Sequence, residues 1–157
     1  TRFDVYLPCA EGPTRAQLRA PSGTFDALAL PPWPADKAIL VVDDEPAVLE
    51  IAGYLLEEAG IPFIAASSGS QALELFQARG AEIGLALLDR TMPRMSGEEL
   101  RAELRAIRPE LPVVMSSGFA AEAGVGQVGG RDLFLKKPYS LRDLVTILHA
   151  ALRYAPG

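Results

Sequence analysis

The chain has 157 residues, 49% of them hydrophobic, which suits one domain plus a tail and argues against global disorder. Its formal net charge of −5 at pH 7 argues against nonspecific nucleic-acid binding, and no apolar run approaches the length of a membrane span. The single cysteine, Cys9, excludes an intrachain disulfide and fits a reducing compartment, so we expect a cytoplasmic protein, and the start at Thr1 suggests a fragment of a longer chain.

The first 36 residues differ in composition from the rest of the chain. Phe3, Val5 and Leu7 alternate with polar residues or Tyr6, which is typical of one edge strand. The segment that follows is rich in proline, glycine and alanine, which is linker composition. We therefore expect three parts: residues 1–8, a linker over residues 9–36, and a folded domain over residues 37–157.

Five short apolar runs, each typical of a buried parallel strand, follow one another in the folded domain. These predicted strands are residues 38–42, 63–66, 85–88, 113–115 and 133–135. A helical pattern follows each of them, so strands and helices alternate. This alternation predicts an α/β fold, a doubly wound five-stranded parallel sheet with helices on both faces.

The predicted helices differ in how clearly their sequences mark them. Two begin with capping-box spacing, Ser68 with Gln71 and Ser96 with Glu99. The fourth helix, within residues 119–130, is the weakest, because its four glycines lower helix propensity. We interpret that segment as mobile.

Polar side chains follow four of the five predicted strands. Asp43 and Asp44 follow the first, Asp89 the third, Ser117 the fourth and Lys137 the fifth. Ligands bind outside the carboxyl ends of the strands in an open parallel sheet, so we expect these five residues to share one crevice. Three carboxylates in one crevice repel each other unless a cation holds them.

These residue types together point to phosphoryl transfer. A carboxylate can attack phosphorus and form an aspartyl phosphate, and Asp89, alone at its strand end, is the natural nucleophile. The reaction needs a divalent cation, for which Asp43 and Asp44 are the predicted ligands. It also needs a fixed cation and hydrogen-bond donors for the phosphoryl oxygens, which Lys137 and Ser117 would supply.

Each of these residues alone has a simpler interpretation. Asp44 could be only a helix N-cap, and Asp89 could be only a turn residue. Ser117 alone would be structural, and Lys137 alone would be a solvated charge. Their occurrence together, in this order and at strand ends, favours the phosphoryl-transfer site.

The sequence resembles the receiver domain of two-component response regulators over residues 37–153. Four segments carry the resemblance: Ile39–Pro46, Leu87–Gly97, Pro112–Gly118 and Phe134–Tyr139. The resemblance implies a flavodoxin-like fold with strand order 2-1-3-4-5. It also implies a phosphoacceptor module that takes a phosphoryl group from a phosphohistidine and then changes conformation.

The resemblance further assigns a role to each site residue. Asp89 would accept the phosphoryl group, and Mg²⁺, with Mn²⁺ as the alternative ion, would bind Asp43, Asp44, Asp89 and the backbone carbonyl of Thr91. Ser117 and Lys137 would contact the phosphoryl oxygens.

Other residues would support the phosphoryl group and the switch. The backbone amides of Arg90 and Gly118 would hold phosphoryl oxygens, and the peptide bond before Pro138 would be cis. Phe134 would be the switch aromatic together with Ser117, although Phe134 also suits a plain core position.

The first eight residues resemble the last strand of a histidine-kinase ATP-binding domain. On that basis the chain would be the C-terminal receiver of a hybrid sensor histidine kinase in a phosphorelay, and the parent a transferase that could be membrane-anchored. The fragment itself would catalyse only its own phosphorylation and dephosphorylation. Its partner would be a phosphohistidine donor, either its own kinase core or a histidine phosphotransfer protein, with no nucleic acid and no direct membrane contact.

Two alternatives remain open at this point. One is an interaction module that works without phosphorylation, which a lack of Mg²⁺ binding would favour. The other is an aspartate-nucleophile phosphatase of the haloacid-dehalogenase type, which would need a second aspartate where this chain has Thr91. We interpret His149, the only histidine, as an incidental helix residue rather than a phosphodonor.

Overall fold

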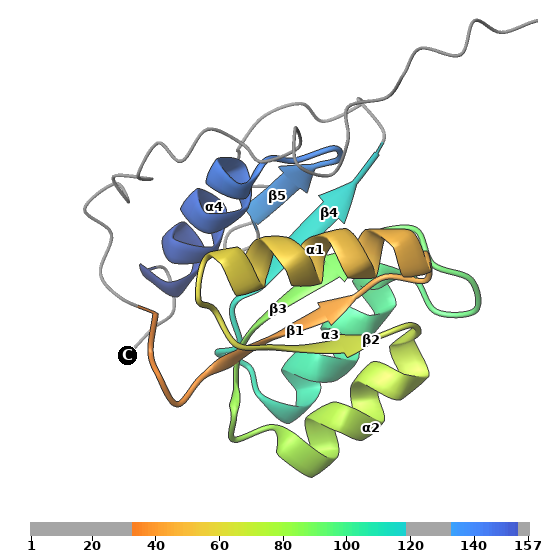
Figure 1. Ribbon diagram of the computed structural model, residues 1–157. Coiled ribbons are helices and arrows are strands. Elements are labelled where there is room, and N and C mark those ends of the chain that lie inside the picture. Colours follow the sequence, from red (N-terminus) through yellow and green to blue (C-terminus); the bar gives the residue numbers. More distant parts are fainter. Residues whose placement is uncertain (1–32, 119–132, 154–157) are drawn as a thin grey trace, which may run out of the picture. The chain divides into compact units, whose positions relative to one another are not determined.

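The computed structural model describes residues 33–118 and 133–153 (Figure 1). Its elements, in chain order, are β1 (Ala38–Val42), α1 (Pro46–Glu58), β2 (Phe63–Ala66), α2 (Gly69–Arg79), β3 (Ile83–Asp89), α3 (Gly97–Ile107), β4 (Val113–Ser117), β5 (Leu133–Lys136) and α4 (Leu141–Arg153). The expected kinase strand at residues 1–8, the linker up to residue 32 and the expected helix within residues 119–130 lie outside the described residues.

The five strands form one parallel sheet with the order β2-β1-β3-β4-β5. This confirms the predicted flavodoxin-like order. Strand β3 is longer than its apolar run suggested, because Ile83 pairs with Ala38 at one end and Asp89 pairs with Ser116 at the other. The ladder thus carries Asp89 to the carboxyl edge of the sheet as a strand residue.

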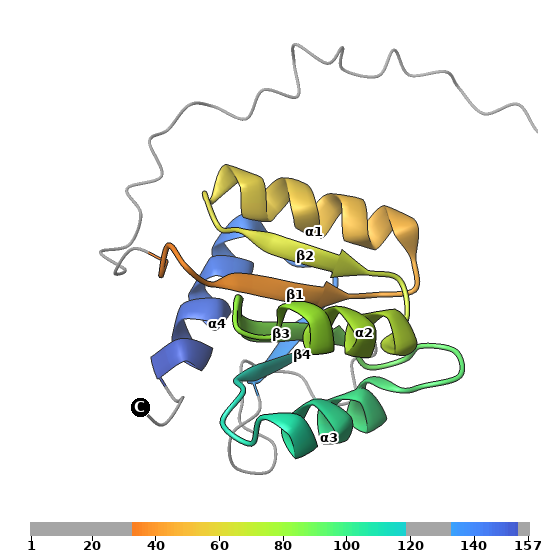
Figure 2. The same ribbon diagram turned by 90° about the horizontal axis from the view of Figure 1, so that it is seen from below.

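Helices cover both faces of the sheet, as predicted (Figure 2). Successive strand residues point to opposite faces, so Leu40 and Val42 pack with α2 and α3, while Ile39 and Val41 pack with α1 and α4. All four side chains are at most 3% exposed. Burial of each such side chain stabilises the fold by roughly 1.5–3 kcal/mol, which explains why the strands read as continuous apolar runs.

The two predicted helix caps form in different ways. Ser96 Oγ accepts a hydrogen bond from the Glu99 amide at 3.3 Å, and Glu99 Oε2 accepts one from the Ser96 amide at 2.8 Å, which confirms a capping box. Ser68 Oγ likewise accepts from the Gln71 amide at 3.3 Å. Gln71 Oε1, however, accepts from the Ser67 amide at 2.7 Å, one residue before the position that a capping box requires.

The segment just before β1 packs onto the domain. Trp33 Nε1 donates a hydrogen bond to the Lys37 carbonyl at 2.7 Å, and the Trp33 ring meets the His149 ring edge-on, with centroids 5.8 Å apart. His149 is 7% exposed, and burial, with a smaller effect of the Arg153 charge, lowers its pKa. His149 is therefore a packed residue of α4.

Candidate functional site

Three carboxylates meet at the carboxyl edge of the sheet. Asp43 and Asp44 follow β1, and Asp89 is the last residue of the neighbouring strand β3. One carboxylate oxygen of each residue lies within 4.8 Å of the other two. Asp43 and Asp89 are 3% and 7% exposed, whereas Asp44 is exposed to solvent. The structure therefore brings together the three aspartates that the sequence placed at strand ends.

Lys137, which follows β5, bridges the two buried carboxylates. Its Nζ atom lies 2.5 Å from Asp43 Oδ2 and 2.7 Å from Asp89 Oδ1. Burial acts to lower the pKa of the Lys137 ammonium, but the hydrogen bonds and charges of the two aspartates outweigh it and raise that pKa. The lysine is thus charged, and it offsets part of the repulsion within the cluster. The Lys137–Pro138 peptide bond is cis, as the resemblance implied.

Backbone amides hold the second oxygen of each buried carboxylate. Asp43 Oδ1 accepts a hydrogen bond from the Glu45 amide at 3.1 Å, and Asp89 Oδ2 accepts one from the Thr91 amide at 3.1 Å. Both hydrogen bonds close the local turn that an aspartate side chain forms with the backbone amide two residues later. Each carboxylate is therefore fixed by Lys137 on one side and by its own loop on the other.

The Thr91 amide was not among the groups found from the sequence. Sequence reasoning had assigned the Arg90 amide instead, but that amide donates to the Ser116 carbonyl at 2.9 Å and so continues the β3–β4 ladder. The apolar run ends before Asp89, so no sequence pattern indicates that pairing extends to Arg90. The structure aims the Thr91 amide, rather than that of Arg90, at the Asp89 carboxylate.

The two serines at the end of β4 occupy different environments. Ser116 is 2% exposed, and its hydroxyl donates to the Leu88 carbonyl at 3.4 Å. Ser117 is half-buried, and its carbonyl accepts a hydrogen bond from the Lys137 amide at 2.9 Å. Gly118 follows at an exposed position with open space around its Cα. Ser117 rather than Ser116 thus lies beside the lysine of the site.

Two aromatic residues flank Lys137 in the sequence. Phe134 lies in β5 opposite Met115 and is partly buried against the core on the α2 and α3 side. Tyr139 is half-buried against the core on the α1 and α4 side, and burial raises its pKa although the charge of Lys137 acts to lower it. Sequence reasoning missed Tyr139, although its place directly after Lys137-Pro138 could have indicated it.

The donor set of the cluster fits a hard divalent cation. Carboxylate oxygens are the ligands that Mg²⁺ and Mn²⁺ prefer, whereas zinc sites favour nitrogen and sulfur donors. The exposed carboxylate of Asp44 offers an entry side, and the buried carboxylates of Asp43 and Asp89 offer fixed oxygens. The arrangement can thus bind a divalent ion beside a carboxylate nucleophile and a lysine.

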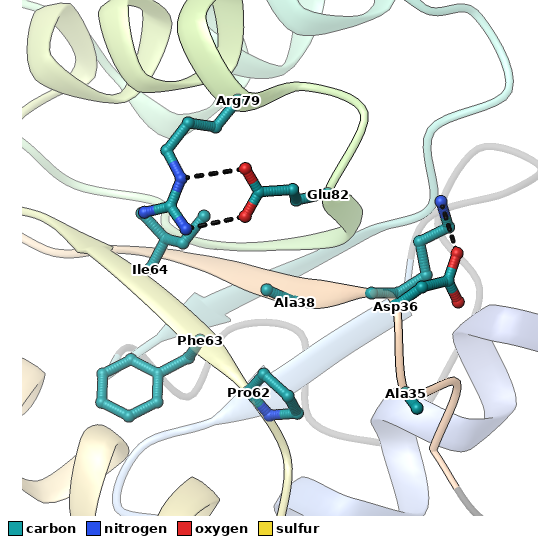
Figure 3. Close-up of a pocket in the computed structure, with 9 residues that line it drawn as sticks. Ala35, Asp36, Ala38, Pro62, Phe63, Ile64, Arg79 and Glu82 are labelled. Atoms are coloured by element: carbon teal, nitrogen blue, oxygen red, sulfur yellow. Dashed lines mark hydrogen bonds and ion pairs between the residues drawn. The ribbon is translucent and has the colours of Figure 1, made fainter.

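An open pocket of about 290 Å³ lies at the opposite, amino edge of the sheet, where β1 and β2 begin (Figure 3). Its charged groups pair with one another: Arg79 binds Glu82 through hydrogen bonds of 3.2 and 2.7 Å, and Lys37 lies 3.1 Å from Asp36. This pocket takes no part in the site formed by Asp43, Asp44, Asp89 and Lys137.

Among the described helices, none combines the length and apolar character needed to cross a bilayer.

Comparisons with known proteins agree with this geometry. The family described as response regulator receiver domain matches residues 39–149. The sensory transduction protein RegX3 of Mycolicibacterium smegmatis is 36% identical over 118 residues, which are 74% of this chain and 50% of RegX3. The sensor kinase CckA of Brucella abortus is 34% identical over 116 residues, which are 73% of this chain and 12% of CckA. The chain thus spans about half the length of RegX3 and a smaller share of CckA.

Two solved structures with similar folds are described as receiver proteins. The response regulator receiver domain protein from Clostridium thermocellum has a TM-score of 0.65 at 28% identity, covering 74% of this chain and 94% of that one. A response regulator receiver protein from Sinorhizobium medicae has a TM-score of 0.65 at 30% identity, covering 76% and 97%. The similarity covers these two solved chains almost completely, so each of them consists almost entirely of the fold that it shares with this chain.

Proposed function

The chain belongs to the response regulator receiver domain family and is a receiver domain of two-component signalling, and we propose that Asp89 is its phosphoacceptor. The position of the Asp89 carboxylate carries this proposal. It is nearly buried, its two oxygens accept hydrogen bonds from Lys137 and from the Thr91 amide, and two further carboxylates stand beside it. Asp43 and Asp44 lie in the short turn between β1 and α1, which begins at Pro46, whereas Asp89 ends its strand in front of the longer loop of residues 90–96.

The transfer that we propose exchanges one bond for another. An Asp89 carboxylate oxygen attacks the phosphorus of a phosphohistidine, and a P–O bond forms while the P–N bond breaks. The electron pair of that bond stays on the imidazole nitrogen, which takes up a proton. The Lys137 ammonium and the Thr91 amide, already in contact with the Asp89 carboxylate, would then face the charge of the phosphoryl oxygens. Later attack of water on phosphorus releases inorganic phosphate and restores the carboxylate.

Asp43, Asp44, Asp89 and the backbone carbonyl of Thr91 are the groups that would hold Mg²⁺ or Mn²⁺. The chemistry that such an ion supplies is screening of the negative charge that gathers between nucleophile and phosphoryl group. The chain already contains part of this screening in Lys137, which carries one positive charge against three carboxylates. The remaining negative charge favours a divalent ion at this place.

The conformational response would pass through Ser117 and Phe134. The half-buried Ser117 lies at the end of β4, and its carbonyl accepts a hydrogen bond from the Lys137 amide. Its hydroxyl would turn towards a phosphoryl group on Asp89. Phe134, three residues before Lys137, is only partly buried and can change its packing without breaking a hydrogen bond of its own side chain. The Gly118 amide would serve as a further phosphoryl donor.

The parent protein that we infer is a hybrid histidine kinase. The match to the sensor kinase CckA, of which this chain covers 12%, supports a receiver within a longer kinase. Residues 1–8 would then close an ATP-binding domain, residues 9–36 would be the linker and residues 37–157 the receiver. The donor would be the kinase's own phosphohistidine or a histidine phosphotransfer protein in the cytoplasm.

Intact mass measured after incubation with acetyl phosphate tests the acceptor. We expect the wild-type chain to gain one phosphoryl group in the presence of Mg²⁺ and to gain none without it. Asp89→Asn should stay unmodified, because its amide is not a nucleophile, while its circular dichroism spectrum stays native. Modification of Asp89→Asn, or no gain on folded wild type, would contradict the proposal. The latter result would favour an interaction module that works without phosphate.

A further inference from the structure

The loop between β3 and α3, residues 90–96, starts and ends beside Asp89 at the carboxyl edge of the sheet (Figure 2). The Gly97 amide donates a hydrogen bond to the Arg90 carbonyl at 3.1 Å, which ties the last turn of the loop to its first residue. A Cβ atom at Gly97 would collide with the Asp89 carbonyl and would lie 3.0 Å from the Arg90 Cα atom. The start of α3 is therefore packed directly on the backbone of Asp89 and Arg90.

An ion pair closes the same loop through side chains. Arg90 Nε lies 2.9 Å from Glu98 Oε1, in the first turn of α3, and the two side chains are 40% and 42% exposed. The middle of the loop is held elsewhere, since Met92 is 8% exposed and the Met95 side chain lies against Gly69 of α2. The Arg90–Glu98 pair thus joins the two ends of the loop, while other contacts hold the middle of the loop in place.

Thr91, the first residue inside this closure, supplies the two backbone groups that the proposed site uses. The Thr91 amide donates to Asp89 Oδ2, and the Thr91 carbonyl is the proposed backbone ligand of the metal ion. The Thr91 amide and the Arg90 carbonyl belong to one planar peptide unit, so the direction of this amide depends on the backbone torsions of Arg90. Three hydrogen bonds constrain these torsions. The Arg90 amide donates to the Ser116 carbonyl, the Arg90 carbonyl accepts from the Gly97 amide, and the Arg90 side chain donates to the Glu98 carboxylate.

We propose that Arg90 is a positioning residue whose ion pair with Glu98 holds the Thr91 backbone in the orientation that binds the divalent ion. This inference rests on the proposed function, because it concerns the metal site of the phosphoacceptor. It assigns to the Arg90 side chain a role in metal affinity, although the side chain is positively charged and belongs to the residue directly after Asp89, one of the proposed metal ligands.

Simple electrostatics makes the opposite prediction for one variant. Arg90→Gln removes a positive charge near three carboxylates, so Coulomb interactions alone would tighten Mg²⁺ binding. Loss of the positioning contact would weaken it. Glu98→Gln weakens binding on both accounts, because it removes a negative charge as well as the contact. Arg90→Gln is therefore the variant that separates the two explanations.

The experiment is a Mg²⁺ titration of the 157-residue chain, followed by the backbone amide NMR signals of Asp89 and Thr91. We expect Arg90→Gln and Glu98→Gln each to weaken Mg²⁺ binding by about threefold, the scale of a partly exposed ion pair. The charge reversal Arg90→Glu/Glu98→Arg should restore the affinity to within about twofold of wild type, because it rebuilds the pair with the same total charge.

The matched control is Glu82→Gln, which breaks the Arg79–Glu82 pair at the other edge of the sheet. Those side chains are 48% and 53% exposed, similar to the pair at the loop. We expect this control to lose a comparable amount of thermal stability and none of its Mg²⁺ affinity.

Mg²⁺ binding by Arg90→Gln that is as tight as or tighter than wild type would overturn the positioning role while leaving the proposed function intact. Equal weakening by Glu82→Gln would also overturn it. Absence of Mg²⁺ binding by the wild-type chain would overturn the positioning role and the proposed metal site together.

Discussion

The Gly97 backbone lies so close to the Asp89 carbonyl that no side chain fits between them. Because the group on the other side is backbone, it cannot move away as a flexible side chain would. We therefore expect Gly97→Ala to destabilise the domain by about 1–3 kcal/mol, the usual cost of overpacking. Chemical denaturation measures this loss. Gly118→Ala is the control, since nothing lies within 4 Å of its added Cβ atom, and an equal loss there would refute the explanation.

Removal of Lys137 should destabilise the metal-free domain. Lys137→Met leaves the buried carboxylates of Asp43 and Asp89 without their shared cation, which we expect to cost about 1–3 kcal/mol at neutral pH. Mg²⁺ should recover a large part of this loss, because it supplies positive charge to the same oxygens. Thermal melts with and without Mg²⁺ measure both effects. A variant as stable as wild type in metal-free buffer would show that the lysine does not offset the repulsion.

Removal of Asp89 should have the opposite effect on the metal-free domain. Asp89→Asn lowers the number of clustered carboxylates from three to two and leaves Lys137 paired with Asp43. Because repulsion is relieved, we expect a higher melting temperature without metal, and a weaker response of that temperature to added Mg²⁺. A lower melting temperature than wild type in metal-free buffer would contradict this reasoning.

The buried His149 should make stability depend on pH. Burial, and to a smaller extent Arg153, lowers the pKa of His149 below its ordinary value of 6.5. Between these two pKa values the unfolded chain binds more protons than the folded chain. The contribution of His149 to stability is therefore complete above pH 6.5 and is lost as the pH falls from 6.5 through the folded-state pKa.

Urea midpoints on either side of pH 6.5 would measure this dependence. His149→Phe keeps an aromatic ring against Trp33 and cannot titrate, so its midpoint should vary less with pH than that of wild type. Trp33 is the only tryptophan in the chain, so its fluorescence reports on the same contact. Identical pH profiles for the two proteins would exclude His149 as the source.

The fold was predictable because the sequences of its strands are clearly marked as continuous apolar runs. Runs such as Ile39–Val42 are buried on both faces, which is typical of a parallel sheet covered by helices, and the helical patterns between the runs favour that arrangement. The carboxylates and Lys137 were predictable because they follow such runs directly. What the sequence could not show is where strand pairing stops, and in the structure the Arg90 amide still pairs with the Ser116 carbonyl.

Contacts between distant positions were equally hidden from the sequence. The Arg90–Glu98 pair spans eight residues and depends on how the loop returns to the sheet, which no local pattern encodes. Trp33 stands among prolines in a segment with linker composition. Its ring nevertheless packs against His149 of α4, which lies more than 100 residues later in the sequence. Such contacts follow from tertiary packing, and only the folded chain reveals them.

The acidic site joins the first strand of the sheet to the last. Lys137 lies 94 residues after Asp43 and 48 residues after Asp89, and it arrives at them only when β5 takes its place at the sheet edge. A chain in which β5 has not docked at this edge therefore lacks the Lys137 ammonium beside Asp43 and Asp89. If the proposed transfer depends on Lys137, we expect a chain with β5 undocked not to accept a phosphoryl group at Asp89.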